Sequence, residues 1–327
     1  MNRFCFVLVG YFLSFHTWSM TPCEHNPATP CIRYLGVGAL DIRYQGERIL
    51  TDPFYTPFSI WDIITLTPYK SNHEAIRTAL GDYEKDVSAV LVGHGHYDHL
   101  ADLPTIKTYL KDDAPIIASP TSINMISSAF NMKHLMPIAS EQVSQWLWIA
   151  DGWIRIKPQY SEHAPQFASI NLFPEEIHDA KAVLPEYIWQ WKQGKNLTFL
   201  MDFLEAPFEP AKVKHRLFLQ TSASSFPIGY QAIEDDIAVD SVWIAAASFH
   251  NVENYPAGLL TGYKPKQVHL MHWENFFKPW WDEPKALSLL DQEALNEDIS
   301  KHFSGAFSYA QPGEYAHWEI AEPLDTQ

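Results

Sequence analysis

The chain has 327 residues, of which 46% are apolar and 14% aromatic, so it can form one large buried core and lacks the composition of a disordered protein. Its 23 basic and 39 acidic residues give a formal net charge of −16 at pH 7. Because this charge opposes attraction to nucleic-acid phosphates, nucleic acid is not expected as a partner. An anionic small molecule is still compatible with a locally positive metal site.

The N-terminal residues 1–20 have the pattern of a secretory signal peptide. One basic residue, Arg3, precedes an apolar run over residues 4–15, which is too short for a stable membrane span, and small residues follow it. We therefore expect an exported protein, periplasmic or secreted; if the segment is instead a buried first element, the protein is cytoplasmic. Residues 21–31 (TPCEHNPATPC) are expected to form a polar, proline-rich linker, and residues 32–327 a single domain.

Removal of the predicted signal peptide would take away Cys5 and leave Cys23 and Cys31. In an oxidising compartment these two cysteines could form a local disulfide, worth about 2 kcal/mol through loop closure. Two free thiols are the alternative, and the sequence leaves both open. Neither cysteine lies near the histidines described below, so neither is assigned to a metal.

In chain order, the sequence predicts three short strands joined by turns over residues 32–54. A helix is expected over 73–85, a buried β-branched strand over 87–93, and the start of a second helix within 102–112. Mostly strands, with intervening helical or loop segments, are expected at 114–120, 127–135, 145–160, 196–205, 215–225, 240–249 and 266–273. The prediction is a mixed α/β domain of layered sheets, with its chemistry at the strand ends.

Metal-ligating side chains collect where these strands end. The run HGHYDH places His94, His96, Asp98 and His99 directly after the strand at 87–93, and other strands are followed by His163, Ser222, His250 and His272. Imidazole nitrogens and carboxylate oxygens are the ligands that Zn²⁺ prefers when no thiolate is present. The pattern therefore predicts a metal centre, with Zn²⁺ as the expected ion and Mn²⁺ or Fe²⁺ as alternatives.

The segment HGHYDH after VSAVLVG resembles the signature of the metallo-β-lactamase superfamily. The resemblance extends from LGVGALDIRYQGERILTDP, which ends just after Asp52, to VHLMHWENFF, and it implies an α/β fold of the four-layer αββα sandwich type with metals at one edge. The segments DHLADLP and MHWENFF look most similar to a branch that includes ascorbate-phosphate lactonase-like proteins and N-acyl phosphatidylethanolamine phospholipase D-like enzymes.

By position, the resemblance also implies a role for each residue. His94, His96 and His163 would hold a first ion, and Asp98, His99 and His272 a second. Asp52 would orient ligands without binding metal itself, although an aspartate that starts a turn before Pro53 is an equal alternative.

One departure from the family pattern concerns the aspartate that usually bridges both ions. It follows a strand and a glycine in the family, whereas this chain has Thr221 and Ser222 there. A hydroxyl cannot supply that negative charge, so the second ion is expected to bind more weakly. Three explanations stay open: a single ion, another carboxylate such as Asp202 or Glu205, or a substrate group such as phosphate that completes the bridge.

These observations predict a metal-dependent hydrolase in which metal-bound hydroxide attacks an ester-type bond, either a phosphodiester or a lactone. Asp98 would orient the hydroxide, and His250 is the candidate proton donor or substrate contact. The aromatic segments 54–72 and 272–284 could line an entrance for a small or lipid-like substrate, with plain packing as the alternative. The alternative function is an exported metal- or ligand-binding protein that has lost catalysis. The oligomeric state is left open.

Overall fold

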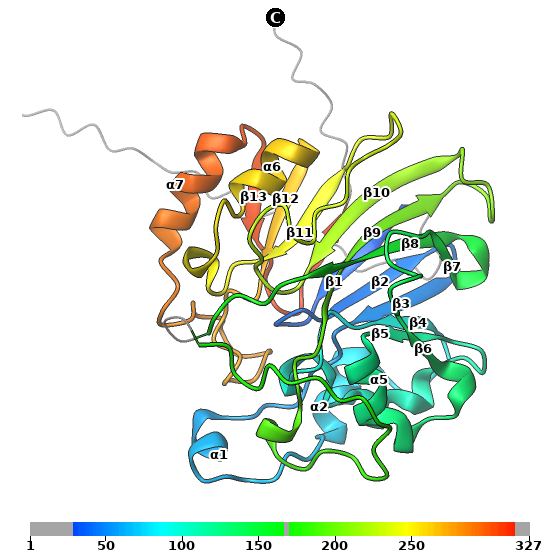
Figure 1. Cartoon of the computed structure of the whole chain (residues 1–327), viewed down its shortest axis with the longest axis vertical. Coiled ribbons are helices and arrows are strands. Elements are labelled where there is room, and N and C mark those ends of the chain that lie inside the picture. The colour runs from blue at the N-terminus through cyan, green and yellow to red at the C-terminus, as the bar shows by residue number, and fades with distance from the viewer. Residues whose placement is uncertain (1–28, 167–169, 318–327) are drawn as a thin grey trace, which may run out of the picture.

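The computed structural model describes residues 29–166 and 170–317 of the chain. In this part, two seven-stranded sheets lie face to face with helices on their outer faces (Figure 1). The first sheet has the strand order β14-β1-β2-β3-β4-β5-β6, formed by β14 (Tyr315–His317), β1 (Cys31–Tyr34), β2 (Leu40–Tyr44), β3 (Glu47–Thr51), β4 (Val87–Leu91), β5 (Ile116–Ala118) and β6 (Leu135–Pro137).

The second sheet has the order β13-β12-β11-β10-β9-β8-β7. Its strands are β13 (Ala306–Tyr309), β12 (Gln267–Met271), β11 (Ser241–Ala245), β10 (Val213–Gln220), β9 (Asn196–Leu204), β8 (Ile154–Ser161) and β7 (Leu147–Ile149). The α-helices are α1 (Ile60–Ile64), α2 (His73–Leu80), α3 (Tyr97–Leu100), α4 (Leu103–Ile106), α5 (Pro120–Ile126), α6 (Ala257–Tyr263) and α7 (Gln292–His302).

Three apolar layers hold the sandwich together. One lies between the sheets, where Ile49 and Leu91 of the first sheet share a buried cluster with Met201 of the second. A second cluster joins the first sheet to α2, α4 and α5, and a third joins the second sheet to α6 and α7. Successive strand residues face opposite layers, as Ile49 and Leu50 do in β3, which is why neighbouring positions in this strand are both apolar. The expected αββα sandwich is confirmed.

Most of the expected elements form, with shorter bounds. The three strands expected over 32–54 are β1, β2 and β3. The helix expected over 73–85 ends at Leu80, because Gly81 takes φ +88° and its N–H closes the last turn on Arg77. The segment 127–135 is largely two 3₁₀ turns, and only Leu135 belongs to a strand.

The sheet topology brings several strand ends to one edge of the sandwich. β3 and β4 are parallel neighbours, so the residues that follow Thr51 and Leu91 emerge together. In the facing sheet β10, β11 and β12 are parallel, and β8 has the same direction because it and β10 are both antiparallel to β9. Segments far apart in the sequence therefore meet at this edge.

The expected signal peptide and residues 21–28 of the expected linker lie outside the described residues. Cys31 is disulfide-bonded, and both other cysteines, Cys5 and Cys23, lie outside the described part of the chain. The alternative of a free Cys31 thiol is therefore wrong. None of the described helices has the length and apolar character needed to cross a membrane.

A buried ion network joins three strands of the second sheet. The Asp202 carboxylate, fully buried in β9, accepts hydrogen bonds from Arg155 of β8 at 2.7 and 2.9 Å and from Arg216 of β10 at 2.6 and 2.8 Å. Arg216 also pairs with Asp235 at 2.6 Å, and the Trp146 ring lies 4.0 Å from the Arg155 guanidinium. Both carboxylate oxygens of Asp202 are thus committed to neighbouring strands.

Asp202→Asn is expected to lower the free energy of unfolding by about 3–5 kcal/mol, because it leaves buried guanidinium groups without their shared counter-charge. Urea denaturation monitored by tryptophan fluorescence measures the effect. The matched control is Glu205→Gln, three residues further on and exposed, which should change the value by no more than about 0.5 kcal/mol. Equal stabilities for the two variants would contradict this account of the network.

Candidate metal centre

The HGHYDH segment forms the turn between β4 and α3. Two glycines allow it to fold tightly: a Cβ on Gly93 would collide with the Thr221 hydroxyl, and one on Gly95 would collide with the Lys192 carbonyl. The Gly95 N–H donates to the Gln193 carbonyl at 3.0 Å. The alternation of histidine and glycine therefore follows from close packing of this turn against loops of the other sheet.

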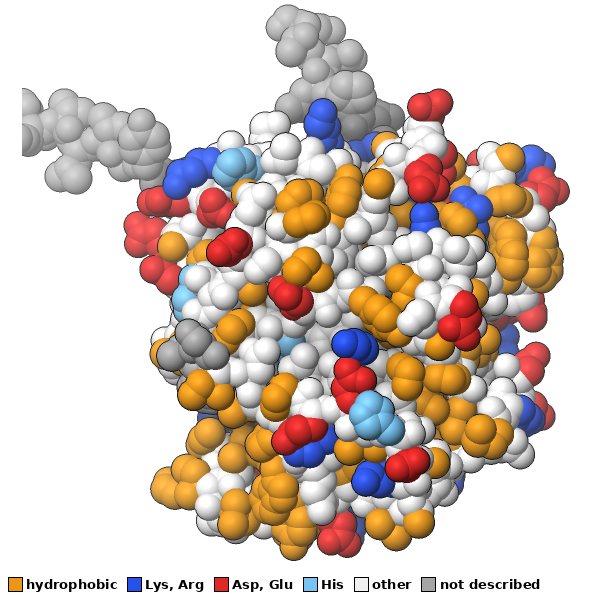
Figure 2. Space-filling view, viewed as in Figure 1, with side chains coloured by type: hydrophobic (Ala, Val, Ile, Leu, Met, Phe, Trp, Pro, Cys, Tyr) orange, Lys and Arg blue, Asp and Glu red, His pale blue; other side chains and the backbone are white. Residues whose placement is uncertain are grey.

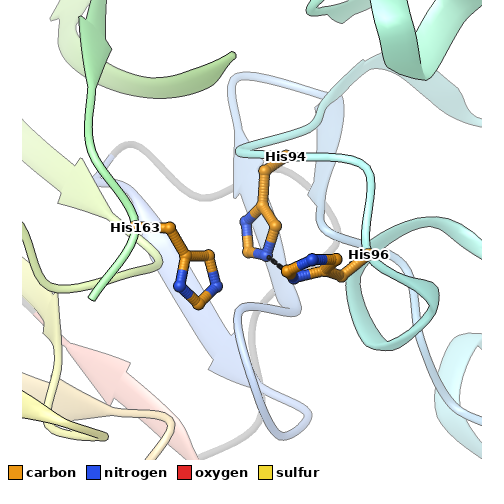
Figure 3. Close-up of side chains that lie close together, drawn as sticks. All are labelled: His94, His96 and His163. Carbon is orange, nitrogen blue, oxygen red and sulfur yellow. Dashed lines mark hydrogen bonds between the residues drawn. The ribbon is translucent and has the colours of Figure 1, made fainter. Parts of the chain in front are cut away.

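A first group of three imidazoles converges at this turn. His94 and His96 extend from it, and His163 reaches them from the loop after β8 (Figure 3). His94 Nε2 lies 3.1 Å from His96 Nδ1, and the His163 ring centroid lies 4.6 and 5.0 Å from those of His94 and His96. One ligand atom from each residue lies within 4.8 Å of the other two, which is close enough for a single ion to contact all three.

A second group lies beside the first and contains Asp98, His99 and His272. Asp98 Oδ2 is 3.7 Å from Nε2 of His99 and 3.7 Å from Nε2 of His272. The ring centroids of His94 and His99, one from each group, are 3.9 Å apart. The structure therefore brings together all six side chains expected at the metal centre, from three separate strand ends.

For His96 and His163, one ring nitrogen points away from the other histidines and forms a hydrogen bond there. This bond determines which nitrogen carries the proton. His96 Nε2 lies 2.8 Å from the Leu172 carbonyl oxygen, and His163 Nδ1 lies 2.6 Å from the Ala164 carbonyl oxygen. A carbonyl only accepts, so these outer nitrogens carry the proton, and a neutral ring then has a lone pair on its inner nitrogen. The inner nitrogen of His96, Nδ1, faces His94 Nε2, and the inner nitrogens of His96 and His163 can both donate a lone pair to a cation bound in this group.

Burial keeps these rings neutral. It lowers the pKa of His96 to about 3, of His163 to about 4 and of His272 to about 3, with further lowering from neighbouring histidines in His96 and His272. Burial also raises the pKa of Asp98 to about 7. Neutral imidazoles and one carboxylate are suitable ligands for a divalent transition-metal ion, so the residues present fit such an ion.

Asp52 lies behind His99. Its Oδ2 is 2.7 Å from His99 Nδ1, its Oδ1 accepts the Gly93 N–H at 2.6 Å, and the Thr221 side chain hydrogen-bonds to the same carboxyl group. Complete burial raises the pKa of Asp52 to about 8. Asp52 thus fixes the ring orientation of His99, whose Nε2 faces Asp98, and it belongs to neither ligand group.

Neither proposed substitute for the bridging aspartate reaches the centre. Asp202 is held by two arginines, and Glu205 is exposed at the β9–β10 hairpin, the end of β9 opposite to the metal centre. Both suggestions from the sequence are wrong for this physical reason. The Thr221 side chain hydrogen-bonds to Asp52, and Ser222 is buried but belongs to neither ligand group. Among the described residues, the two ligand groups contain one carboxylate, that of Asp98.

His250 lies on an exposed 3₁₀ turn, Phe249–Asn251, after β11. Its ring packs edge-on against Phe249 at 5.6 Å, and neither ligand group includes it. The structure does not bring His250 together with the other site residues, and its role as a proton donor stays a prediction.

A cavity of about 380 Å³ lies beside the second ligand group. The segments 54–57 and 274–285 supply most of its lining, and Phe276 in its wall packs 5.1 Å from the His272 ring. Parts of both aromatic segments thus line a cavity. The rest of the first segment is different: Ile60, Trp61, Ile64 and Leu66 on and after α1 are exposed. Apolar side chains also gather at the lower edge of the face in Figure 2, the end at which Figure 1 shows α1.

The sequence reasoning missed Glu274 and Tyr34, which support this corner of the site. Glu274, 4% exposed, accepts hydrogen bonds from the Val37 N–H at 2.6 Å and the Tyr34 hydroxyl at 2.7 Å. The same hydroxyl accepts the His272 N–H at 2.9 Å and so holds the backbone of this ligand, whose φ is +52°. The glutamate two residues after His272 in MHWENFF was the available signal.

Comparisons with known proteins agree with this fold. Residues 47–150, which span the HGHYDH turn, match the family model described as the beta-lactamase superfamily domain. The metallo-β-lactamase fold protein YhfI from Bacillus subtilis superposes with a TM-score of 0.52 at 13% identity, over 88% of this chain and 99% of that one. The chain has the metallo-β-lactamase fold.

Two further solved structures show the same metallo-β-lactamase fold. An isothiocyanate hydrolase from Delia radicum gut bacteria has a TM-score of 0.52 at 12% identity, over 88% of this chain and 99% of that one. CmlA, a diiron β-hydroxylase from Streptomyces venezuelae, has a TM-score of 0.53 at 13% identity, over 90% of this chain and 55% of that one. No curated protein matches the sequence, and the resemblance to the lactonase and phospholipase D branch stays a prediction.

Asp52→Asn is expected to weaken zinc affinity about 10- to 100-fold, the usual cost of losing the group that orients a ligating histidine. Competition with a chromophoric chelator measures the affinity. Asp113→Asn, an exposed aspartate, is the control and should bind zinc as the unmodified protein does. Unchanged affinity in Asp52→Asn would show that His99 needs no such support.

Ser222→Asp is expected to raise the number of tightly held ions from one to two per chain, because it places a carboxylate beside Thr221 at the family's usual bridging position. Elemental analysis after zinc loading and dialysis gives the count. Ser304→Asp adds the same charge at an exposed position and should leave the count unchanged. Two ions already in the unmodified protein would mean that another group compensates for the missing aspartate.

Proposed function

We propose that the protein is a metal-dependent hydrolase that cleaves an ester-type bond, with a phosphodiester or a lactone as its substrate class. The observation that carries the proposal is the convergence of His94, His96 and His163 on one point, with the second group of Asp98, His99 and His272 directly beside them. A divalent cation bound there would supply Lewis acidity and lower the pKa of a nearby water molecule toward neutrality.

The chain's own residues would divide the work as follows. His94, His96 and His163 would hold the tighter ion, with Asp98, His99 and His272 as ligands of a second. Asp98 Oδ2, 3.7 Å from each of its two imidazole partners, is the carboxylate oxygen placed to accept a hydrogen bond from the attacking water. Because His94 and His99 are only 1% exposed, bulk water would be excluded from the inner side of the metal centre.

The charge of the centre favours an anionic substrate over a neutral one. Two divalent cations beside the single carboxylate of Asp98 would leave a net charge of about +3, whereas a bridging aspartate would reduce it. A phosphodiester or another anionic ester would supply the missing negative charge on binding. This argument supports the phosphodiester over an uncharged lactone.

We also propose zinc as the ion and export as the destination of the protein. The all-nitrogen and oxygen ligand set suits zinc and is compatible with manganese or iron. The disulfide at Cys31 supports an oxidising compartment.

Zinc-loaded protein is expected to hydrolyse bis(p-nitrophenyl) phosphate, to lose this activity with a chelator and to regain it with zinc. His163→Ala should reduce kcat/KM by at least about 100-fold, since it removes a metal ligand and not merely a group that orients one. His302→Ala, at an exposed position on α7, is the matched control and should retain activity.

Zinc held at the centre with no turnover of the phosphodiester or of a lactone probe would overturn the hydrolase proposal. That result would favour the second candidate, a metal- or ligand-binding protein, for which the missing bridging carboxylate is the supporting observation.

A further inference from the structure

Glu274 places a buried carboxyl group in the wall of the cavity beside the metal centre. It is 4% exposed and lines the cavity, and its hydrogen-bond donors, the Tyr34 hydroxyl and backbone N–H groups such as that of Val37, are neutral. Within residues 29–166 and 170–317, no Lys, Arg or His forms an ion pair with its carboxylate. Buried carboxylates in proteins usually pair with a cation, so this wall offers one half of an ion pair.

The remaining walls suit an organic cation. Phe54, Phe276 and Trp280 line the same cavity, and the faces of aromatic rings attract alkylammonium groups through their quadrupoles. The other charged residues of the lining, Lys278, Asp282, Glu283 and Lys285, are exposed and balance one another, so the net charge of the lining comes from Glu274. A volume of about 380 Å³ falls within the range of small-molecule sites.

The cavity is physically joined to the metal centre. The Tyr34 hydroxyl donates to Glu274 and accepts the His272 N–H at 2.9 Å, and Phe276 packs 5.1 Å from the His272 ring. A ligand whose cationic group contacts Glu274 would therefore be separated from His272 by the side chains of Tyr34 and Phe276. Its ester bond could then reach the second group of metal ligands.

We propose that this cavity binds an alkylammonium group, with Glu274 as its counter-charge and Phe54, Phe276 and Trp280 as its aromatic walls. That the ligand is a substrate rests on the proposed function, which this proposal makes more specific. The substrate would be an ester or phosphodiester of an alkylammonium compound. Glu274 would then determine substrate specificity and take no part in bond cleavage.

The test compares choline with 3,3-dimethylbutan-1-ol, its uncharged isostere, as ligands of the full-length protein. Titration calorimetry, supported by tryptophan fluorescence, measures the two dissociation constants. We expect choline to bind at least tenfold more tightly than the isostere, and Glu274→Gln to abolish this preference while the isostere binds as before. Glu283→Gln removes an exposed charge from the same lining and should keep the preference.

Equal affinities for the two probes, no binding of either, or a preference that persists in Glu274→Gln would each overturn the proposal. Trp280→Leu is a second variant that keeps the carboxylate and should weaken choline binding several-fold, so the proposal stays falsifiable if Glu274→Gln fails to fold. Binding needs no turnover: choline binding without hydrolysis would overturn only the proposed function, and hydrolysis without choline binding would overturn only this inference.

Discussion

The metal centre depends on hydrogen bonds that fix the ring orientation of three of its five imidazoles. His96 and His163 direct their outer nitrogens at carbonyl oxygens, and His99 directs its outer nitrogen at Asp52. The two carbonyl oxygens only accept, so the inner nitrogens of His96 and His163 carry lone pairs that a cation can use. Hydrogen bonds that fix the tautomer and ring orientation of ligating histidines are a regular feature of metal sites.

The sandwich makes this arrangement rigid. Parallel strands in both sheets end at the same edge, so the ligands extend from short loops whose starting points are fixed by buried strands. In the second sheet, the Asp202 network ties β8, β9 and β10 together through two arginines. The same network explains why a carboxylate that looks available in the sequence is unable to serve the metal centre: both of its oxygens are already bonded.

Negative charge near the centre is distributed unevenly. The two ligand groups together contain one carboxylate, Asp98 of the second group, whereas Glu274 lines the neighbouring cavity. The centre would therefore attract an anion when metal is bound, and the neighbouring cavity would attract a cation. A ligand that carries both charges would satisfy both places, which connects the proposed reaction to the proposed choice of substrate.

The sequence by itself determined the alternation of strands and helices and four of the six metal-ligand candidates, because apolar periodicity and the HGHYDH spacing are local properties of the chain. His163 and His272 came from the resemblance to the family. The helix predicted over residues 73–85 was too long, because it ends before Gly81. The suggestion that Asp202 or Glu205 replaces the bridging aspartate was wrong. Only the tertiary structure decided that His163 and His272 reach the turn, which nitrogens face inward, and that Glu274 lines a cavity. These features depend on hydrogen bonds between residues that are far apart in the sequence: His96 and Leu172 are separated by 76 positions, and Tyr34 and Glu274 by 240. No local pattern specifies such contacts.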